Sequence, residues 1–168
     1  MPDSLPLLNS SLKNNLLMKN KFFTLACILS ISIVSALEAS TPEQEKAFTD
    51  KYKAAFEAGD KATLESFLYT KGAHPMALEF YKMMQADGIG GKISKIELVD
   101  LSPEDAKKAE GVQEGPGGEK TQLPLKPIKK LKITVESKNS EGSSSSTSES
   151  FVAESDGKLV IPVPAKAK

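Results

Sequence analysis

The 168-residue sequence contains no arginine and no tryptophan, and it has a single cysteine and a single histidine. All 22 basic residues are therefore lysines, and 22 acidic residues balance them to a formal net charge of zero. Nucleic-acid binders usually carry a basic surplus and use arginine forks on phosphates and guanines, so we do not expect a nucleic-acid partner. Cys27 lies inside an N-terminal apolar run. An exported chain would hold no thiol, which excludes a disulfide, a thiolate nucleophile and a cysteine-ligated zinc site.

Residues 18–39 have the pattern of a secretory signal peptide. Lys19 and Lys21 precede an apolar run at 22–34, and small residues follow it. The run is shorter than the roughly 20 residues that a membrane-spanning helix needs. The sequence thus predicts export, to the periplasm or to the medium, with no stable membrane anchor after cleavage.

We expect cleavage after Ala36 or Ala39, where small residues end the apolar run. A lipoprotein cut before Cys27 is the alternative, but the apolar run continues past this cysteine. Residues 1–17 have neither a clear period nor a targeting pattern. We interpret them as an over-extended start, with Met18 as the true initiator.

The first part of the exported chain predicts two helices separated by Gly59 and Asp60. Thr41 and Gln44 provide a capping box at the start of the first helix. Gly59 suits the left-handed position after a helix, and Asp60 can cap the next one. Apolar residues at three- and four-residue spacing give the pair a buried face, namely Phe48, Tyr52, Ala55, Phe56, Leu64, Phe67 and Leu68.

A third helix is predicted to begin at His74-Pro75 and to end at Gly88. Its broad apolar face consists of Met76, Phe80, Met83 and Met84, with Ala77 and Tyr81 beside them. Residues 92–101 are rich in Ile, Leu and Val but alternate imperfectly, which predicts a strand with a bulge or one covered on both faces. A short helix at 103–110 and a mobile loop at 111–122 follow.

The last third gives the clearest strand signals. In residues 128–137 apolar and polar side chains alternate, as in a half-buried antiparallel strand. The serine-rich run at 137–150 predicts a loose hairpin loop. Asp156-Gly157 predicts a type I′ turn between two further strands. Prolines and lysines from Pro162 onward are expected to end the sheet.

Helices followed by mostly antiparallel strands predict an α+β fold, with N-terminal helices packed on a curved sheet of about four strands. One domain is expected at 40–164, followed by a tail at 165–168. On the helices Phe48, Tyr52, Phe56, Phe80 and Met84 should meet Leu131, Ile133, Val135 and Phe151 on the sheet. At most a small apolar pocket would then remain inside.

Two segments resemble the NTF2-like superfamily, also called SnoaL-like or cystatin-like α+β cones. The run FEAGD at 56–60, followed by Leu64 and Phe67-Leu68, is similar to its first helical pair. FVAESDGKLVIP at 151–162 is similar to its last hairpin. The resemblance, over about residues 42–163, implies a cavity between helices and sheet. Some members use this cavity for isomerase or dehydratase chemistry and many use it only for binding or assembly.

Four residues on the apolar helix faces are candidates for ligand binding: Tyr52, Phe56, Tyr81 and Met84. The tyrosines are also consistent with ordinary core residues whose hydroxyls lie at the rim. His74 stands before a helix-initiating proline, which favours an N-cap or surface role. Glu97 and Asp100 could act as a general base only if the strand turned them inward.

A local basic cluster comprises Lys126, Lys129, Lys130 and Lys132. It could face anionic lipid or polymer, but the alternation favours a solvated strand face. No motif supplies a nucleophilic triad or a metal cage, and we expect neither a metal nor a cofactor.

Non-catalytic binding of a small apolar ligand or a protein partner is the expected function, with a homodimer as one option. A small cavity enzyme of the isomerase or lyase type, using a tyrosine or a carboxylate for proton transfer, is one alternative. A structural subunit of an envelope assembly is another. Polar side chains converging in a closed pocket would favour the enzyme, and a large exposed apolar patch would favour assembly.

Overall fold

The structure is a computed structural model that describes residues 40–115, 118–139 and 142–167. The predicted signal peptide, Cys27 and the segment before Met18 lie outside these residues. Within them no helix is long and apolar enough to cross a membrane. The described helices are α1 (Pro42–Glu57), α2 (Lys61–Glu65), α3 (Pro75–Ala86) and α4 (Pro103–Glu110). The described strands are β1 (Leu68–Tyr69), β2 (Lys92–Asp100), β3 (Gln113–Glu114), β4 (Lys120–Gln122), β5 (Pro127–Asn139), β6 (Gly142–Ser155), β7 (Lys158–Pro162) and β8 (Ala165–Lys166).

The capping residues place α1 and α2 as the sequence predicts. Thr41 Oγ1 accepts a hydrogen bond from the Gln44 backbone N–H at 3.2 Å, and the Gln44 side chain accepts one from the Thr41 N–H at 2.8 Å. Gly59 has a φ of +72°, which ends α1. Asp60 then accepts from the Thr63 N–H at 3.0 Å and starts α2. Phe67 and Leu68 depart from the prediction, because α2 ends at Glu65 and Leu68 lies in β1.

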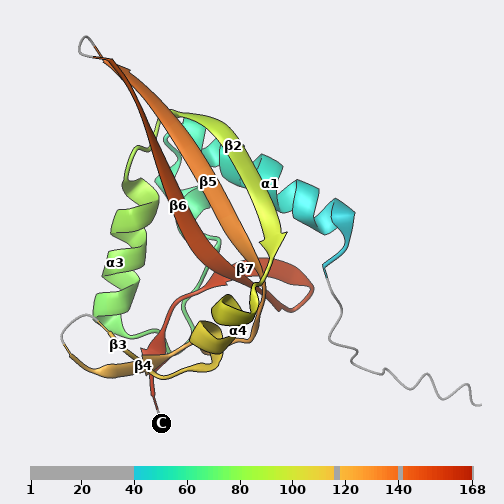
Figure 1. The fold of residues 1–168 in the computed structure, drawn as a ribbon, viewed down its shortest axis with the longest axis vertical. Coiled ribbons are helices and arrows are strands. Elements are labelled where there is room, and N and C mark those ends of the chain that lie inside the picture. Colours follow the sequence, from blue (N-terminus) through green and yellow to red (C-terminus); the bar gives the residue numbers. More distant parts are fainter. Residues whose placement is uncertain (1–39, 116–117, 140–141, 168) are drawn as a thin grey trace, which may run out of the picture. The chain divides into compact units, whose positions relative to one another are not determined.

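A five-stranded sheet in the order β1-β7-β6-β5-β2 forms the main layer (Figure 1). Only the β1–β7 pair is parallel, and the other three pairs of this sheet are antiparallel. A second sheet joins β3, β4 and β8. The fold is therefore α+β with a mostly antiparallel sheet, as predicted, although the main sheet has five strands rather than about four.

β2 contains a β-bulge, one of the two structures that its imperfect alternation predicted. The register with β5 shifts between Ile93 and Lys95. The extra residue brings Ile93, which is buried, and Ile96 and Leu98, which are partly buried, to the same core. Across the sheet, Leu98 pairs with Leu131.

The serine-rich run is a strand and not the loop that the sequence predicted. β6 begins at Gly142 and pairs with β5 in unbroken register as far as Ser150, which lies opposite Leu131. Residues 144–149 are exposed, so serine and threonine carry little cost there, and Thr134 and Thr147 place their hydroxyls 3.1 Å apart. β5, whose alternating sequence predicts a strand, provides the backbone edge with which the serine-rich segment pairs.

Residues 111–122 and the C-terminal tail also depart from prediction. The expected loop contains the β3–β4 pair, and the expected tail contains β8, which pairs with β4. Thr121 is buried at 3% exposure, and its hydroxyl donates to the Gln113 carbonyl at 3.3 Å. The Ala167 N–H donates to the Lys120 carbonyl at 2.9 Å. These short pairs depend on segments far apart in the sequence, which local patterns do not reveal.

The core lies between α1 and the inner face of the main sheet. Its buried members include Phe48, Tyr52, Phe56, Leu64, Phe67, Ile93, Leu131, Ile133, Val152 and Ile161. Helix α3 contributes less than predicted. Phe80 and Met84 remain 43% and 36% exposed, so the expectation that they complete the core is wrong. Helix α3 packs instead through Ala77, Tyr81 and Gln85, which are spaced by one turn.

The turn at Asp156-Gly157 gives a first testable prediction. Both residues have positive φ, +52° and +73°, as a type I′ turn requires. A Cβ at Gly157 would meet no atom within 4 Å, so a substitution there is opposed by backbone conformation alone. We expect Gly157→Val to lower the free energy of unfolding by about 1–3 kcal/mol. Gly157→Asn should cost clearly less, because asparagine tolerates this conformation. Equal losses in urea unfolding would contradict the turn assignment.

Candidate ligand-binding site

Three of the four candidate residues line one small, partly open cavity between α3 and the sheet, called the internal cavity below. Tyr52 on α1 and Tyr81 and Met84 on α3 meet there, across from Leu131 of β5. Phe56 is buried at 3% exposure but is not among the residues that line it. The cavity has a volume of about 20 Å³. A space of this size holds about one water molecule, so it is far smaller than a ligand pocket.

The wall of this cavity is more polar than the sequence predicted. Gln85 of α3 and Ser148 and Ser150 of β6 join the two tyrosines around it. The serines face inward because their cross-strand partners, Ile133 and Leu131, do. Their inward position could not be foreseen while this run was predicted to be a loop.

Gln85 is the polar residue that sequence reasoning missed. It is 8% exposed, and its Nε2 donates to the Leu64 carbonyl at 3.2 Å. Its spacing of four residues from Tyr81 and eight from Ala77 places it on the buried face of α3. That spacing is visible in the sequence. The apolar pattern instead predicted that the methionines form the buried face of this helix.

Burial strengthens the preference of the two phenols for the protonated form. It raises the pKa of Tyr52 to about 12, an effect that the Gln85 side chain partly offsets. Burial also raises the pKa of Tyr81. Both phenols are therefore protonated at neutral pH. They can donate or accept hydrogen bonds there, but neither is suited to act as a general base.

An open groove between α2 and α3 is much larger than the cavity. Its volume is about 380 Å³, within the range of sites that bind small molecules. The apolar part of the lining comprises Leu64, Met83, Ala86 and Ile89, and charged side chains from both helices surround it. Gln85 lines both this groove and the internal cavity.

Exposed apolar side chains continue beside the groove along α3. Met76 is 51% exposed and Met83 is 63% exposed, and Phe80 lies between them in the sequence. We call Met76, Phe80, Met83 and Met84 the α3 apolar row. Single exposed apolar residues are common, but four on one twelve-residue helix form a local concentration.

His74 occupies the N-cap position of α3, as predicted, but its side chain makes no capping hydrogen bond. Its Nε2 lies 2.6 Å from Oε2 of Glu119, and the histidine side chain is only 11% exposed. The hydrogen bond with His74, and then the charge of Lys166, lower the pKa of Glu119. This pair ties α3 to the segment before β4, a contact across 45 residues that no sequence motif indicated.

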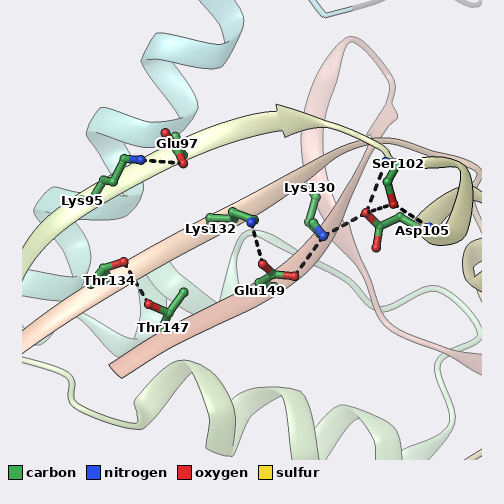
Figure 2. Close-up of polar contacts among 9 residues, drawn as sticks. All are labelled: Lys95, Glu97, Ser102, Asp105, Lys130, Lys132, Thr134, Thr147 and Glu149. Carbon is green, nitrogen blue, oxygen red and sulfur yellow. Dashed lines mark hydrogen bonds and ion pairs between the residues drawn. The ribbon is translucent and has the colours of Figure 1, made fainter. Parts of the chain in front are cut away.

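Every lysine of the predicted basic cluster has a carboxylate partner. Lys130 Nζ lies 2.9 Å from Asp105 and 3.0 Å from Glu149, and Figure 2 shows this chain of contacts continuing to Lys132. Of the other two lysines, Lys126 pairs with Glu110, and Lys129 pairs with both Glu45 and Asp100. The charges are neutralised within the fold, which favours the predicted strand-face role over binding of an anionic polymer.

The Asp105–Lys130 pair predicts an acid-dependent loss of stability. Hydrogen bonds from Lys130, and then from Ser102, lower the pKa of Asp105 to about 2. A depressed carboxylate pKa stabilises the fold fully above its ordinary value of about 4, and this stabilisation is lost as the pH falls toward 2. We therefore expect Asp105→Asn to lower the melting temperature at pH 6 and to change it little near pH 2. A difference that stayed constant over this range would contradict the assignment.

The two candidate strand acids do not point inward. Glu97 pairs with Lys95 at 2.9 Å on the sheet face seen in Figure 2, and the Asp100 side chain is 90% exposed. A general base in β2 required one of these acids to turn inward, and neither does. Across residues 40–115, 118–139 and 142–167, no three His, Cys, Asp or Glu side chains are placed to hold a metal ion.

Comparison with known proteins gives resemblance of fold alone. No family model and no curated protein matches the chain. A helical cell shape determining protein, Pgp2, from Campylobacter jejuni is 14% identical over 68% of this chain, with a TM-score of 0.37. The chain spans only 37% of that protein.

Two further solved structures are similar at the same level. A polyketide cyclase candidate from Xanthomonas campestris pv. campestris is 11% identical, covering 74% of this chain and 91% of that one, with a TM-score of 0.38. A protein of unknown function from Mycobacterium tuberculosis is 12% identical, covering 73% and 68%, with a TM-score of 0.34. Likeness this distant says nothing about ligand or activity.

Proposed function

We propose that this chain is an exported NTF2-like protein that binds a small apolar ligand or a protein partner without catalysis, through the surface formed by α2 and α3. The observation that carries the proposal is the exposure of the α3 apolar row beside a groove of mixed polar and apolar lining. The groove of about 380 Å³ lies directly beside the α3 apolar row, and Met83 belongs to both. Flexible, polarisable methionines suit a surface that adapts to its ligand.

The interior supports the same conclusion. A cavity of about 20 Å³ admits no organic substrate. The phenols that line it, Tyr52 and Tyr81, are protonated at neutral pH like any tyrosine, and burial raises the pKa of each further from neutrality. The convergence of five polar side chains on this cavity is the one feature that favours the alternative of a small cavity enzyme. Such an enzyme would have to move α3 to admit a substrate.

Assembly is the second alternative, and the α3 apolar row is the feature that favours it. A homodimer or an envelope complex that buried this row would remove most of the exposed large apolar side chains among the described residues. Both outcomes are forms of partner binding at the same surface. A small ligand and a protein partner differ in whether the groove alone or the whole row is covered.

Binding at this surface can be tested with a neutral apolar dye, N-phenyl-1-naphthylamine, whose fluorescence rises in apolar surroundings. The chain has no tryptophan to interfere. We expect the folded protein to bind the dye, and the double variant Phe80→Ser/Met83→Ser to bind it about tenfold more weakly, the effect of losing about 1.4 kcal/mol of apolar contact. Val112→Ser is the matched control, because Val112 is 55% exposed but lies outside α3 and the groove. Equal binding by all three proteins would refute the proposal.

Export gives a separate prediction. A protein processed after Ala36 or Ala39 lacks the apolar run at 22–34. Intact-mass measurement of the protein recovered from the periplasm of a bacterial host should find one of these two masses. Recovery of a species that retains this run would contradict cleavage, and a lipid-modified Cys27 would establish the lipoprotein alternative.

A further inference from the structure

A second groove lies between α1 and the start of β7, and it shares no residue with the groove between α2 and α3. We call it the α1–β7 groove. Its volume is about 280 Å³, just below the range of sites for drug-sized molecules, so it suits a small ligand. Its accessible wall is mainly apolar, and the apolar lining comprises Ala47, Phe48, Phe67, Leu159 and Val160.

Two contacts hold the walls of the α1–β7 groove in place. Gln44 Nε2 donates to the Gly157 carbonyl at 3.3 Å, which joins the first turn of α1 to the turn before β7. Lys51 Nζ lies over the ring of Phe67, 5.5 Å from its centre. The shape of the groove is therefore set by contacts within the fold, and these contacts also place a cation above the apolar floor.

The charged side chains that line this groove are both lysines, Lys51 of α1 and Lys158 of β7. Within the described residues, neither has a carboxylate oxygen within 4.0 Å of its Nζ. Hydrogen bonds from Thr63 are the main cause of the lowered pKa of Asp60, and the charge of Lys51 contributes least to it. The groove thus carries a positive charge that the fold leaves available to an anion.

We propose that the α1–β7 groove binds a small amphiphile with one carboxylate. Its apolar body packs on Phe67 and Leu159, and its carboxylate is attracted by the ammonium groups of Lys51 and Lys158. This site goes beyond the proposed function, because it lies on other elements and selects a charged ligand. The α2–α3 groove has two acids and two lysines in its lining, so it offers an anion no net attraction.

Hexanoate and hexanol form a matched pair of probes, since they share a six-carbon chain and only hexanoate is charged at neutral pH. Each would be titrated into the exported protein at low salt while the methyl NMR signals of Ala47, Leu159 and Val160 are followed. We expect both probes to shift these signals, with hexanoate binding about three- to tenfold more tightly, the effect of two exposed ion pairs. Added salt should reduce this preference, because it screens exposed charges.

Two double variants of equal charge locate the preference. Lys51→Gln/Lys158→Gln removes both cations of the groove and should bring the two affinities to within about twofold of each other. Lys107→Gln/Lys108→Gln is the matched control, because it removes the same charge from α4, which does not line the groove. It should retain the preference. All four lysines are exposed, so we expect both variants to keep the fold.

Equal affinities of the wild-type protein for hexanoate and hexanol would overturn the proposal, and so would a preference that survives in Lys51→Gln/Lys158→Gln. Loss of the preference in the α4 control would show that net charge, and not the groove, attracts the anion, which overturns it too. Absence of shifts at Leu159 and Val160 would do the same. Shifts confined to Met83 and Ile89 would place both probes in the α2–α3 groove, which contradicts this inference while supporting the proposed function.

Discussion

Phe67→Ala is expected to lower the free energy of unfolding by about 3–5 kcal/mol, the range for truncating a buried phenylalanine. Phe67 is 6% exposed, and its ring lies 4.9 Å from Phe48 in an edge-on arrangement and 5.2 Å from Tyr52. Such aromatic pairs add to the free energy of burial. The residue also lies between α2 and β1, so its ring fixes the helix pair against the end of the sheet.

Phe80→Ala is the matched control, because it makes the same chemical change at a phenylalanine that is 43% exposed. It should cost no more than about 1.5 kcal/mol, since less apolar surface leaves its burial. Urea unfolding followed by circular dichroism gives both values. Similar losses for the two variants would mean that Phe80 on α3 is packed as tightly as Phe67, contrary to the structure.

Leu131→Ala is expected to cost about 3–5 kcal/mol. Leu131 is fully buried, at 0% exposure, and it lines the small internal cavity. The truncation removes its contacts and also enlarges the cavity, and both effects destabilise. Leu131→Met conserves volume and should cost less than about 1.5 kcal/mol. If the two variants unfolded at the same urea concentration, the tight interior inferred for the wild-type protein would be wrong.

The predictions that held were those set by local chemistry. The capping box at Thr41, the left-handed Gly59 and the turn at Gly157 each depend on residues within a few positions. A bulge in β2 was one of two structures that its imperfect alternation predicted, but it lies between Ile93 and Lys95 and does not explain the change of parity at Val99 and Leu101. These features locate the helices in the first part of the chain and the strands in the last part. That order predicts the α+β class.

The predictions that failed concern contacts between distant segments. The serines of β6 became a strand because β5 offers a complete hydrogen-bonding edge, which serine propensity does not reveal. The Glu119 partner of His74 lies 45 residues away. On α3, the methionines suggested a buried face, whereas the packed face runs through Tyr81 and Gln85. Hydrophobic content alone did not distinguish a core face from an exposed one.

The α3 outcome also changed the candidate site. Tyr52, Tyr81 and Met84 do come together, but around a cavity that holds about one water molecule. A larger space, of about 380 Å³, lies in the groove that α3 forms with α2, and Gln85 lines both. Its location follows from how two helices meet in space, and sequence spacing within either helix does not specify that.

Methyl NMR mapping of the dye contact tests the central claim most directly. The exported protein would be titrated with N-phenyl-1-naphthylamine while methyl signals from the groove and from the interior are followed together. We predict shifts at Leu64, Met83 and Ile89, which line the groove, with those of Leu131 and Ile161, which line the cavity, unchanged. Shifts centred on Leu131 and Ile161 would show that ligands enter the interior, and would contradict a binding surface formed by α2 and α3.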